Sequence, residues 1–306
     1  MKRAYFIILL LILTSCALFK PAPKEAADIL GGEGLVIKLP QIPKELFVGQ
    51  GLEIPLTLEN AGAYKVENAI LSLSGYNPEF VKFRSLPKIE GINLEGRSQF
   101  VPVGERTTKV FTISSINLPS AKERTETFEA VACYPYKTEA SPVVCINPQL
   151  VFGTEDISAG VCDFVDAKIS PTQGAPIAVT KVETWYFIEQ QEVEFRVFVK
   201  DVSGKGVVLN KNAYGKRCLG TEPLKPEDLN VVTAEIFLSG EQLSCYSAAS
   251  EEPQNIFTLA ENQYIRCRAK IDPAQPAYTT PLSVSLSYGY VTLQVFSINL
   301  KNPAFR

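Results

Sequence analysis

Apolar and polar residues alternate along several short stretches of the chain. The stretches 52–58, 193–199 and 282–288 place an apolar residue at every second position. A period of two is typical of half-buried β-strands. Further strands are predicted over residues 69–75, 109–116, 127–134 and 232–240. The chain's 21 prolines and 19 glycines punctuate many short segments. This spacing suits an all-β sandwich fold.

Two positions interrupt the alternation. Pro55 has no amide hydrogen to donate, so its strand is expected at a sheet edge or with a bulge there. Near the end of the chain, residues 291–295 and 296–300 place their apolar residues in opposite phase. A slip of one residue moves side chains to the other face, which predicts a bulge near Val295 and Phe296.

The strands fall into two groups of similar order. We expect one Ig-like β-sandwich domain over residues 34–152 and a second over residues 159–306. The heptapeptides Ala69–Gly75 and Ala234–Gly240 both run from alanine to Leu-Ser-Gly. They indicate related domains in tandem, although so short a match also arises by chance between strands.

The N-terminus has the pattern of an export signal. Lys2 and Arg3 precede an apolar run over residues 4–13, which is too short to span a bilayer. Thr14-Ser15-Cys16 then resembles a lipobox, in which the cysteine receives a lipid. We therefore expect a signal peptide over residues 1–15 and a lipid-anchored tether over residues 16–33, with the membrane as a partner. The alternative is an ordinary signal peptide with Cys16 near the cut by chance.

Without Cys16, an even number of cysteines remains. They are Cys133, Cys145, Cys162, Cys218, Cys245 and Cys267. Six cysteines allow fifteen pairings. Proximity in sequence and the expected domain boundary favour Cys133 with Cys145, Cys245 with Cys267, and Cys162 with Cys218. No CxxC pair is present, so disulfides are favoured over a metal site or a redox-active pair.

Composition narrows the chemistry. The chain has no histidine, which removes the commonest general base and metal ligand. Without Lys2 and Arg3 it has 28 basic and 33 acidic residues, a formal charge of −5, and no basic stripe for nucleic acid. Phosphate-binding and dinucleotide-binding motifs are lacking as well. We expect no catalytic residues, no cofactor and no metal.

Residues 185–187 form a dense aromatic cluster. Trp185 and Tyr186 are candidate binding aromatics for a glycan or a protein partner. The favoured alternative is that Trp185 and Phe187 face the core while Tyr186 faces outward, as strand alternation predicts.

Two segments resemble known archaeal modules. Residues 56–69 carry Asn60-Ala61-Gly62 after a predicted strand, and residues 195–208 carry Asp201-Val202-Ser203-Gly204 in the same place. This strand–turn–strand signature resembles the CARDB-like and S-layer-associated Ig-like domains of archaeal surface proteins.

A wider resemblance rests on five segments, 132–138, 144–148, 173–179, 277–282 and 288–290. They are similar to an uncharacterised family of exported archaeal lipoprotein-like proteins. That resemblance implies a location and an architecture, but no activity and no catalytic residues.

These observations lead to three functional hypotheses. The first is a non-catalytic protein tethered to the outer face of the cell membrane, which presents sandwich loops or edge strands to an envelope protein or glycan. The second is an accessory subunit of an envelope secretion, pilus or transport complex. The third and least favoured is a hydrolase of surface polymers.

Overall fold

The structure is a computed structural model that describes residues 31–98, 101–119, 122–148, 167, 169–170, 172–187, 189–260, 263–272 and 274–304. It is almost entirely β, which confirms the predicted fold class. Two short helices are described, α4 (Tyr214–Leu219) and the 3-10 helix η2 (Pro226–Asp228). No helix among the described residues is long and apolar enough to cross a membrane.

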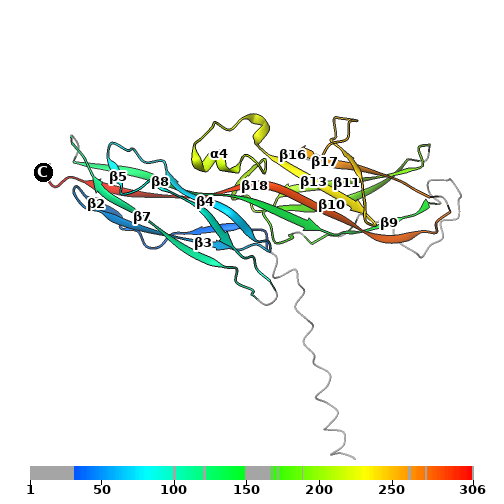
Figure 1. Ribbon diagram of the computed structural model, residues 1–306, viewed down its shortest axis with the longest axis horizontal. Coiled ribbons are helices and arrows are strands. Elements are labelled where there is room, and N and C mark those ends of the chain that lie inside the picture. The colour runs from blue at the N-terminus through cyan, green and yellow to red at the C-terminus, as the bar shows by residue number, and fades with distance from the viewer. Residues whose placement is uncertain are drawn as a thin grey trace, which may run out of the picture.

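Two four-stranded antiparallel sheets lie at opposite ends of an elongated molecule (Figure 1). The N-sheet has the order β1–β3–β7–β5, with bounds Leu35–Lys38, Leu52–Asn60, Arg106–Ile116 and Val81–Phe83. The C-sheet has the order β10–β11–β17–β15, with bounds Ile177–Phe187, Glu192–Asp201, Tyr264–Lys270 and Ser244–Tyr246.

Both sheets pack against one ten-stranded sheet, here called the shared sheet. Its main path is β14–β13–β18–β8–β4–β6, with bounds Glu241–Gln242, Val231–Leu238, Tyr278–Lys301, Glu123–Ala140, Val66–Ser74 and Lys88–Leu94. The strands β2 (Glu45–Phe47), β9 (Val143–Ile146) and β12 (Gly206–Leu209) also pair with β18, and β16 (Ile256–Thr258) pairs with β13. The inner faces of all three sheets form one continuous hydrophobic core.

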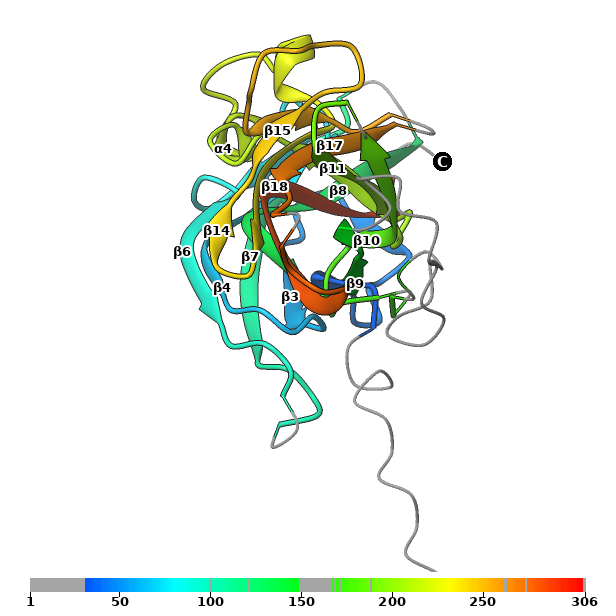
Figure 2. The ribbon, with the colours of Figure 1, turned by 90° about the vertical axis from the view of Figure 1, so that its right-hand side faces the viewer.

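A long two-stranded ribbon runs through the middle of the shared sheet. β8 and β18 pair without interruption from Val284–Ala140 to Lys301–Glu123. At about 3.4 Å per residue, these 18 pairs span roughly 60 Å. Figure 2 views the molecule from the end that holds β9 and shows β18 and β8 near the centre of the view.

The ribbon changes the expected domain organisation. The predicted boundary between residues 152 and 159 assigns β8 to the first domain and β18 to the second. In the structure, the end of β8 lies beside β18 residues that pair with β13, and the end of β18 pairs with β2 of the first half. Each half therefore contains a strand that the sequence order gives to the other half.

The two halves still correspond strand for strand. The order β1–β3–β7–β5 matches β10–β11–β17–β15, and β4 lies beside β8 as β13 lies beside β18. The predicted similarity of Ala69–Gly75 and Ala234–Gly240 falls on β4 and β13 and the turns after them. In both turns the closing glycine has a positive φ, 86° at Gly75 and 90° at Gly240. Glycine adopts this conformation without a steric penalty.

Four buried tyrosines mark the point where the two halves meet. Tyr134 and Tyr136 of β8 stand opposite Tyr290 and Tyr288 of β18, and their rings pack on one another at centroid distances of 5.6 to 6.4 Å. None of the four exceeds 5% exposure. We call this group the tyrosine junction.

The hydroxyls of the tyrosine junction bind both halves. Tyr136 donates to Asn60 Oδ1 at the end of β3 (3.3 Å), and Tyr290 donates to Asp201 Oδ2 at the end of β11 (3.1 Å). The hydroxyl of Tyr134 accepts a bond from the backbone N–H of Leu35 (2.9 Å). The two predicted turn motifs therefore meet at the centre of the molecule.

Close backbone approach to this junction requires glycine. A Cβ at Gly62 would lie 2.0 Å from the Tyr136 hydroxyl, and a Cβ at Gly34 would lie 2.4 Å from that of Tyr134. Both distances are far below van der Waals contact, so these glycines let the chain pass over the tyrosine rings.

The two predicted irregularities have different outcomes. Pro55 lies in β3, which is an interior strand, but β1 pairs with β3 only from Thr57 to Asn60. Odd-numbered residues of β3 direct their N–H toward β1, as the bond from Ala61 N to Gly34 O shows. The missing donor of Pro55 therefore faces a position beyond the end of β1, where no partner is lost.

The bulge predicted near Val295 and Phe296 is wrong. The β8–β18 register is continuous through these residues. Phe296, Ile298 and Leu300 face the core, whereas Val291, Leu293 and Val295 lie on the outer face of the shared sheet. Both faces of this strand carry apolar residues: on the outside α4 covers Val291, whereas Leu293 and Val295 are exposed.

Candidate functional site

The outer face of the C-sheet holds the chain's single tryptophan. The structure reverses the favoured orientation of residues 185–187: Tyr186 packs against the core, and Trp185 is 47% exposed. The reason is a β-bulge between Val179 and Lys181 of β10, which shifts the alternation by one residue. The hydroxyl of Tyr186 donates to Cys145 O (3.1 Å) and accepts from Asn147 N (3.1 Å).

The exposed ring of Trp185 is held in place by two charged neighbours. The guanidinium of Arg196 lies 4.1 Å from the ring centroid, and Glu183 accepts the indole N–H at 3.2 Å. Guanidinium–aromatic stacking of this kind is attractive and orients both planes. The ring is therefore held by two neighbours although nearly half of the residue's surface meets solvent.

A buried carboxylate organises the arginines of this face. Glu194 is 1% exposed, and its two oxygens lie 3.0 Å from Arg196 Nε and 3.1 Å from Arg268 Nε. Arg266 lies 4.0 Å away and also binds the backbone oxygens of Ser247 and Ser250. A buried charge is tolerated only when it is paired in this way.

Aromatic rings and arginines continue across the sheet. Arg196 also lies 5.1 Å from the Tyr264 ring, and Arg268 lies 5.5 Å from Tyr246. We call the set the Trp185 face; its members are Trp185, Glu194, Arg196, Tyr246, Tyr264, Arg266 and Arg268. Flat rings suit the apolar faces of sugar rings, and guanidinium groups donate to carboxylates and hydroxyls. These groups suit contacts with a ligand, and no nucleophile lies beside a base among them.

The cysteines form two described disulfides. Cys245 bonds to Cys267, as predicted, and joins the edge strand β15 to β17 beneath the Trp185 face. Cys133 bonds to Cys218, so the predicted pairs Cys133–Cys145 and Cys162–Cys218 are wrong. Cys145 is also disulfide-bonded. Cys16 and Cys162 lie outside the described residues.

The Cys133–Cys218 bond fastens α4 to the outer face of the shared sheet. Cys218 packs there with Ile70, Val131, Leu209 and Val291, all buried. Cys133 and Cys218 are 85 residues apart in the sequence, so proximity along the chain could not identify this pair. The two disulfides are typical of proteins that fold in an oxidising compartment.

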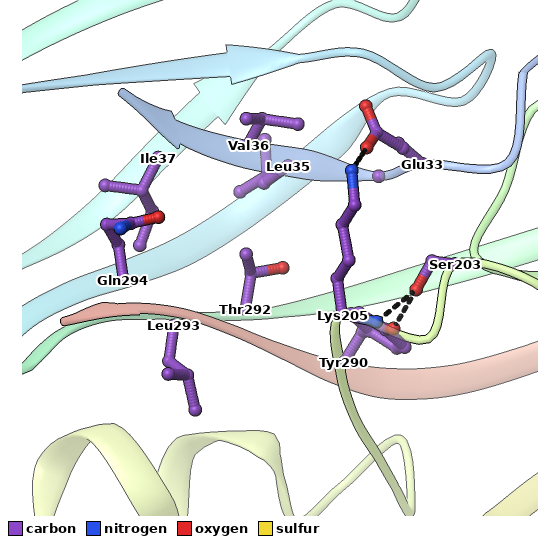
Figure 3. Close-up of a pocket in the computed structure, with 11 residues that line it drawn as sticks. Glu33, Leu35, Val36, Ile37, Ser203, Lys205, Tyr290, Thr292, Leu293 and Gln294 are labelled. Atoms are coloured by element: carbon purple, nitrogen blue, oxygen red, sulfur yellow. Dashed lines mark hydrogen bonds and ion pairs between the residues drawn. The ribbon is translucent and has the colours of Figure 1, made fainter. Parts of the chain in front are cut away.

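A groove of about 370 Å³ opens beside the tyrosine junction, between β1 and β18 (Figure 3). Leu35, Val36 and Ile37 line one wall, and Thr292, Leu293 and Gln294 line the other. Lys205 and Glu33 form an ion pair at one end. The sequence does not reveal this groove, because its two walls are more than 250 residues apart in the chain and each has the pattern of an ordinary strand.

The described residues offer no site for metal chemistry. No group of three or more cysteine, aspartate or glutamate side chains that could hold a metal ion occurs among them.

Comparisons with known proteins add little to this geometry. No protein-family model matches the chain, and no curated protein does. Among solved structures, a DUF4466 family protein from Parabacteroides merdae is similar over 84% of this chain and 99% of its own, at 9% identity and a TM-score of 0.18. A score this low supports no argument about fold or function. The resemblance to archaeal surface modules stays a prediction.

Proposed function

We propose that this protein is a non-catalytic, lipid-tethered module of the cell surface that binds an envelope glycan through the Trp185 face. One observation carries the proposal: Trp185 is 47% exposed, and Arg196 and Glu183 hold its ring on the outer face of the C-sheet. Leaving so much indole surface in water lowers stability, and fixing the ring reduces the entropy lost when a ligand stacks on it.

The arginines give this face a preference for negatively charged ligands. Arg196, Arg266 and Arg268 approach the buried Glu194. Glu251, which pairs with Arg266 and Arg268, is 70% exposed, and Glu183 binds the indole of Trp185. A polymer with carboxylate groups can replace Glu251 at the arginines without disturbing Glu194. Acidic polysaccharides therefore fit the surface better than neutral ones.

Because Trp185 is the only tryptophan, its fluorescence reports this face directly. The defined probe is polygalacturonate, an acidic polysaccharide. We expect it to change the fluorescence emission of Trp185 in a saturable way. Trp185→Ala is expected to abolish retention on immobilised polysaccharide, and Trp185→Phe to keep part of it. Glu251→Gln serves as the matched charge control and is expected to bind at least as well. Equal retention of wild type and Trp185→Ala would contradict the proposal.

A further inference from the structure

The shared sheet has a gap in one of its edges. Along the side of β18 away from β8, pairing with β12 ends at Thr292, and pairing with β2 begins at Asn299. Residues 293–298, which we call the open edge, have no strand on that side among the residues that the structure describes. At about 3.3 Å per residue, the gap is roughly 20 Å long.

Backbone groups point into this gap. The N–H of Asn299 donates to Lys44 on the open side, whereas the N–H of Asn302 donates to Lys122 on the β8 side. By alternation, Val295 and Ser297 also direct their N–H and C=O groups to the open side. Within the described chain, the one hydrogen bond to these backbone groups on the open side is a long one, from Gln294 Nε2 to Val295 O at 3.5 Å.

The opposite wall of the groove is an unpaired edge too. β1 is the outermost strand of the N-sheet, and its Leu35 N–H points away from β3 to the Tyr134 hydroxyl. By the same alternation Ile37 presents its N–H and C=O to the groove. Gln294 has the inward orientation of a core residue yet is exposed, so the sandwich is uncovered here.

The sequence of the open edge does not protect it. Leu-Gln-Val-Phe-Ser-Ile contains no charge, proline or glycine, and Leu293 and Val295 are 43% and 46% exposed. Natural proteins usually guard an unpaired edge with charges, prolines or bulges. A free edge without them is a template for another strand.

We infer that the open edge binds one extended peptide segment of a partner protein by β-strand addition. The segment would fill the missing strand position between β12 and β2 and face β1 across the groove. It would carry uncharged residues, with apolar ones at alternate positions to cover the partly buried Phe296. The edge of a preformed sheet is excluded as the occupant, because β12 and β2 project at both ends of the gap. This inference does not depend on the Trp185 face.

The test uses the full chain and a synthetic peptide of alternating threonine and valine with a lysine at each end. Amide hydrogen exchange is expected to slow at least tenfold at Val295, Ser297 and Ile37 when the peptide is present. A peptide of the same length with proline at alternate positions is the control and should protect none of them. Unchanged exchange with the first peptide at millimolar concentration would overturn the inference.

A matched pair of variants tests the geometry. Val295→Pro removes an N–H that points into the gap and breaks no bond to β8, and it is expected to weaken peptide binding at least tenfold. Val295→Thr keeps that N–H and is expected to bind like wild type. Equal binding by both variants, with native circular dichroism, would overturn the inference. Protection of the same amides by dimerisation without peptide would also overturn it, since the occupant would then be a second copy.

Discussion

At the residue scale, the tyrosine junction makes the protein sensitive to alkali. Burial raises the pKa of Tyr134, Tyr136, Tyr288 and Tyr290 well above the ordinary 10.0. A raised pKa favours the protonated form in the folded state, so the stabilisation is complete below pH 10 and is lost as pH rises above it. Each group contributes a slope of about 1.4 kcal/mol per pH unit in that range.

We therefore expect alkaline unfolding that is steep and begins just above pH 10. Circular dichroism and phenolate absorbance, followed together, should show these four tyrosines ionising only as the β-structure is lost. Ionisation of Tyr134, Tyr136, Tyr288 and Tyr290 before any change in structure would contradict this.

A single hydroxyl of this junction can be removed. Tyr136→Phe deletes the bonds to Asn60 and to the backbone N–H of Tyr64 and leaves their buried groups without this partner. The expected loss in free energy of unfolding is about 1–3 kcal/mol, measured by urea denaturation. Tyr246→Phe, on the surface, is the control and should cost little.

At the element scale, strands were predictable from the sequence and their neighbours were not. Alternation over 52–58, 193–199 and 282–288 depends on burial of one face and falls on β3, β11 and β18. The orientation of Trp185 depended on a bulge at Val179, which is set by pairing with β11. The partner of Cys133 depended on where α4 packs. Neither the bulge in β10 nor the packing position of α4 leaves a local signal in the sequence.

The two described disulfides should differ in their effect on stability. The Cys133–Cys218 bond closes a loop with a separation of 85 residues, and Cys245–Cys267 closes one of 22. A chain-entropy estimate gives about 4.6 and about 3.4 kcal/mol. We expect the double variant Cys133→Ala and Cys218→Ala to lose more stability than the variant with Cys245→Ala and Cys267→Ala, as measured by urea denaturation. The reverse order would contradict the loop argument.

At the scale of the whole molecule, the β8–β18 ribbon makes the two halves interdependent. A fragment of residues 31–152 lacks β18, and a fragment of residues 159–306 lacks β8, although each would contain one of the expected domains. Without the central partner strand, each fragment exposes core residues and an unpaired edge. We expect neither fragment to fold alone and the full chain to unfold in one calorimetric transition. Two separate transitions would contradict the shared ribbon.

The location of the protein also belongs to this scale. If Cys16 carries a lipid, Cys16→Ser is expected to move the protein from the membrane fraction to the soluble fraction of intact cells. Thr14→Ser, which keeps a small residue beside the cysteine, should leave it with the membrane. Membrane association of the Cys16→Ser variant would contradict the anchor.

The place where the chain enters the described fold has a mechanical consequence. Gly31 accepts a bond from Gly174 N (3.0 Å), and Gly174 O in turn accepts from the hydroxyl of Tyr136 in the tyrosine junction (3.5 Å). The stretch from Cys16 to Leu30 reaches at most about 50 Å when extended. A lipid at Cys16 would therefore attach the elongated molecule to the membrane near its middle, and not at either end. A ligand that pulls one half away from the membrane would then tilt the other half toward it.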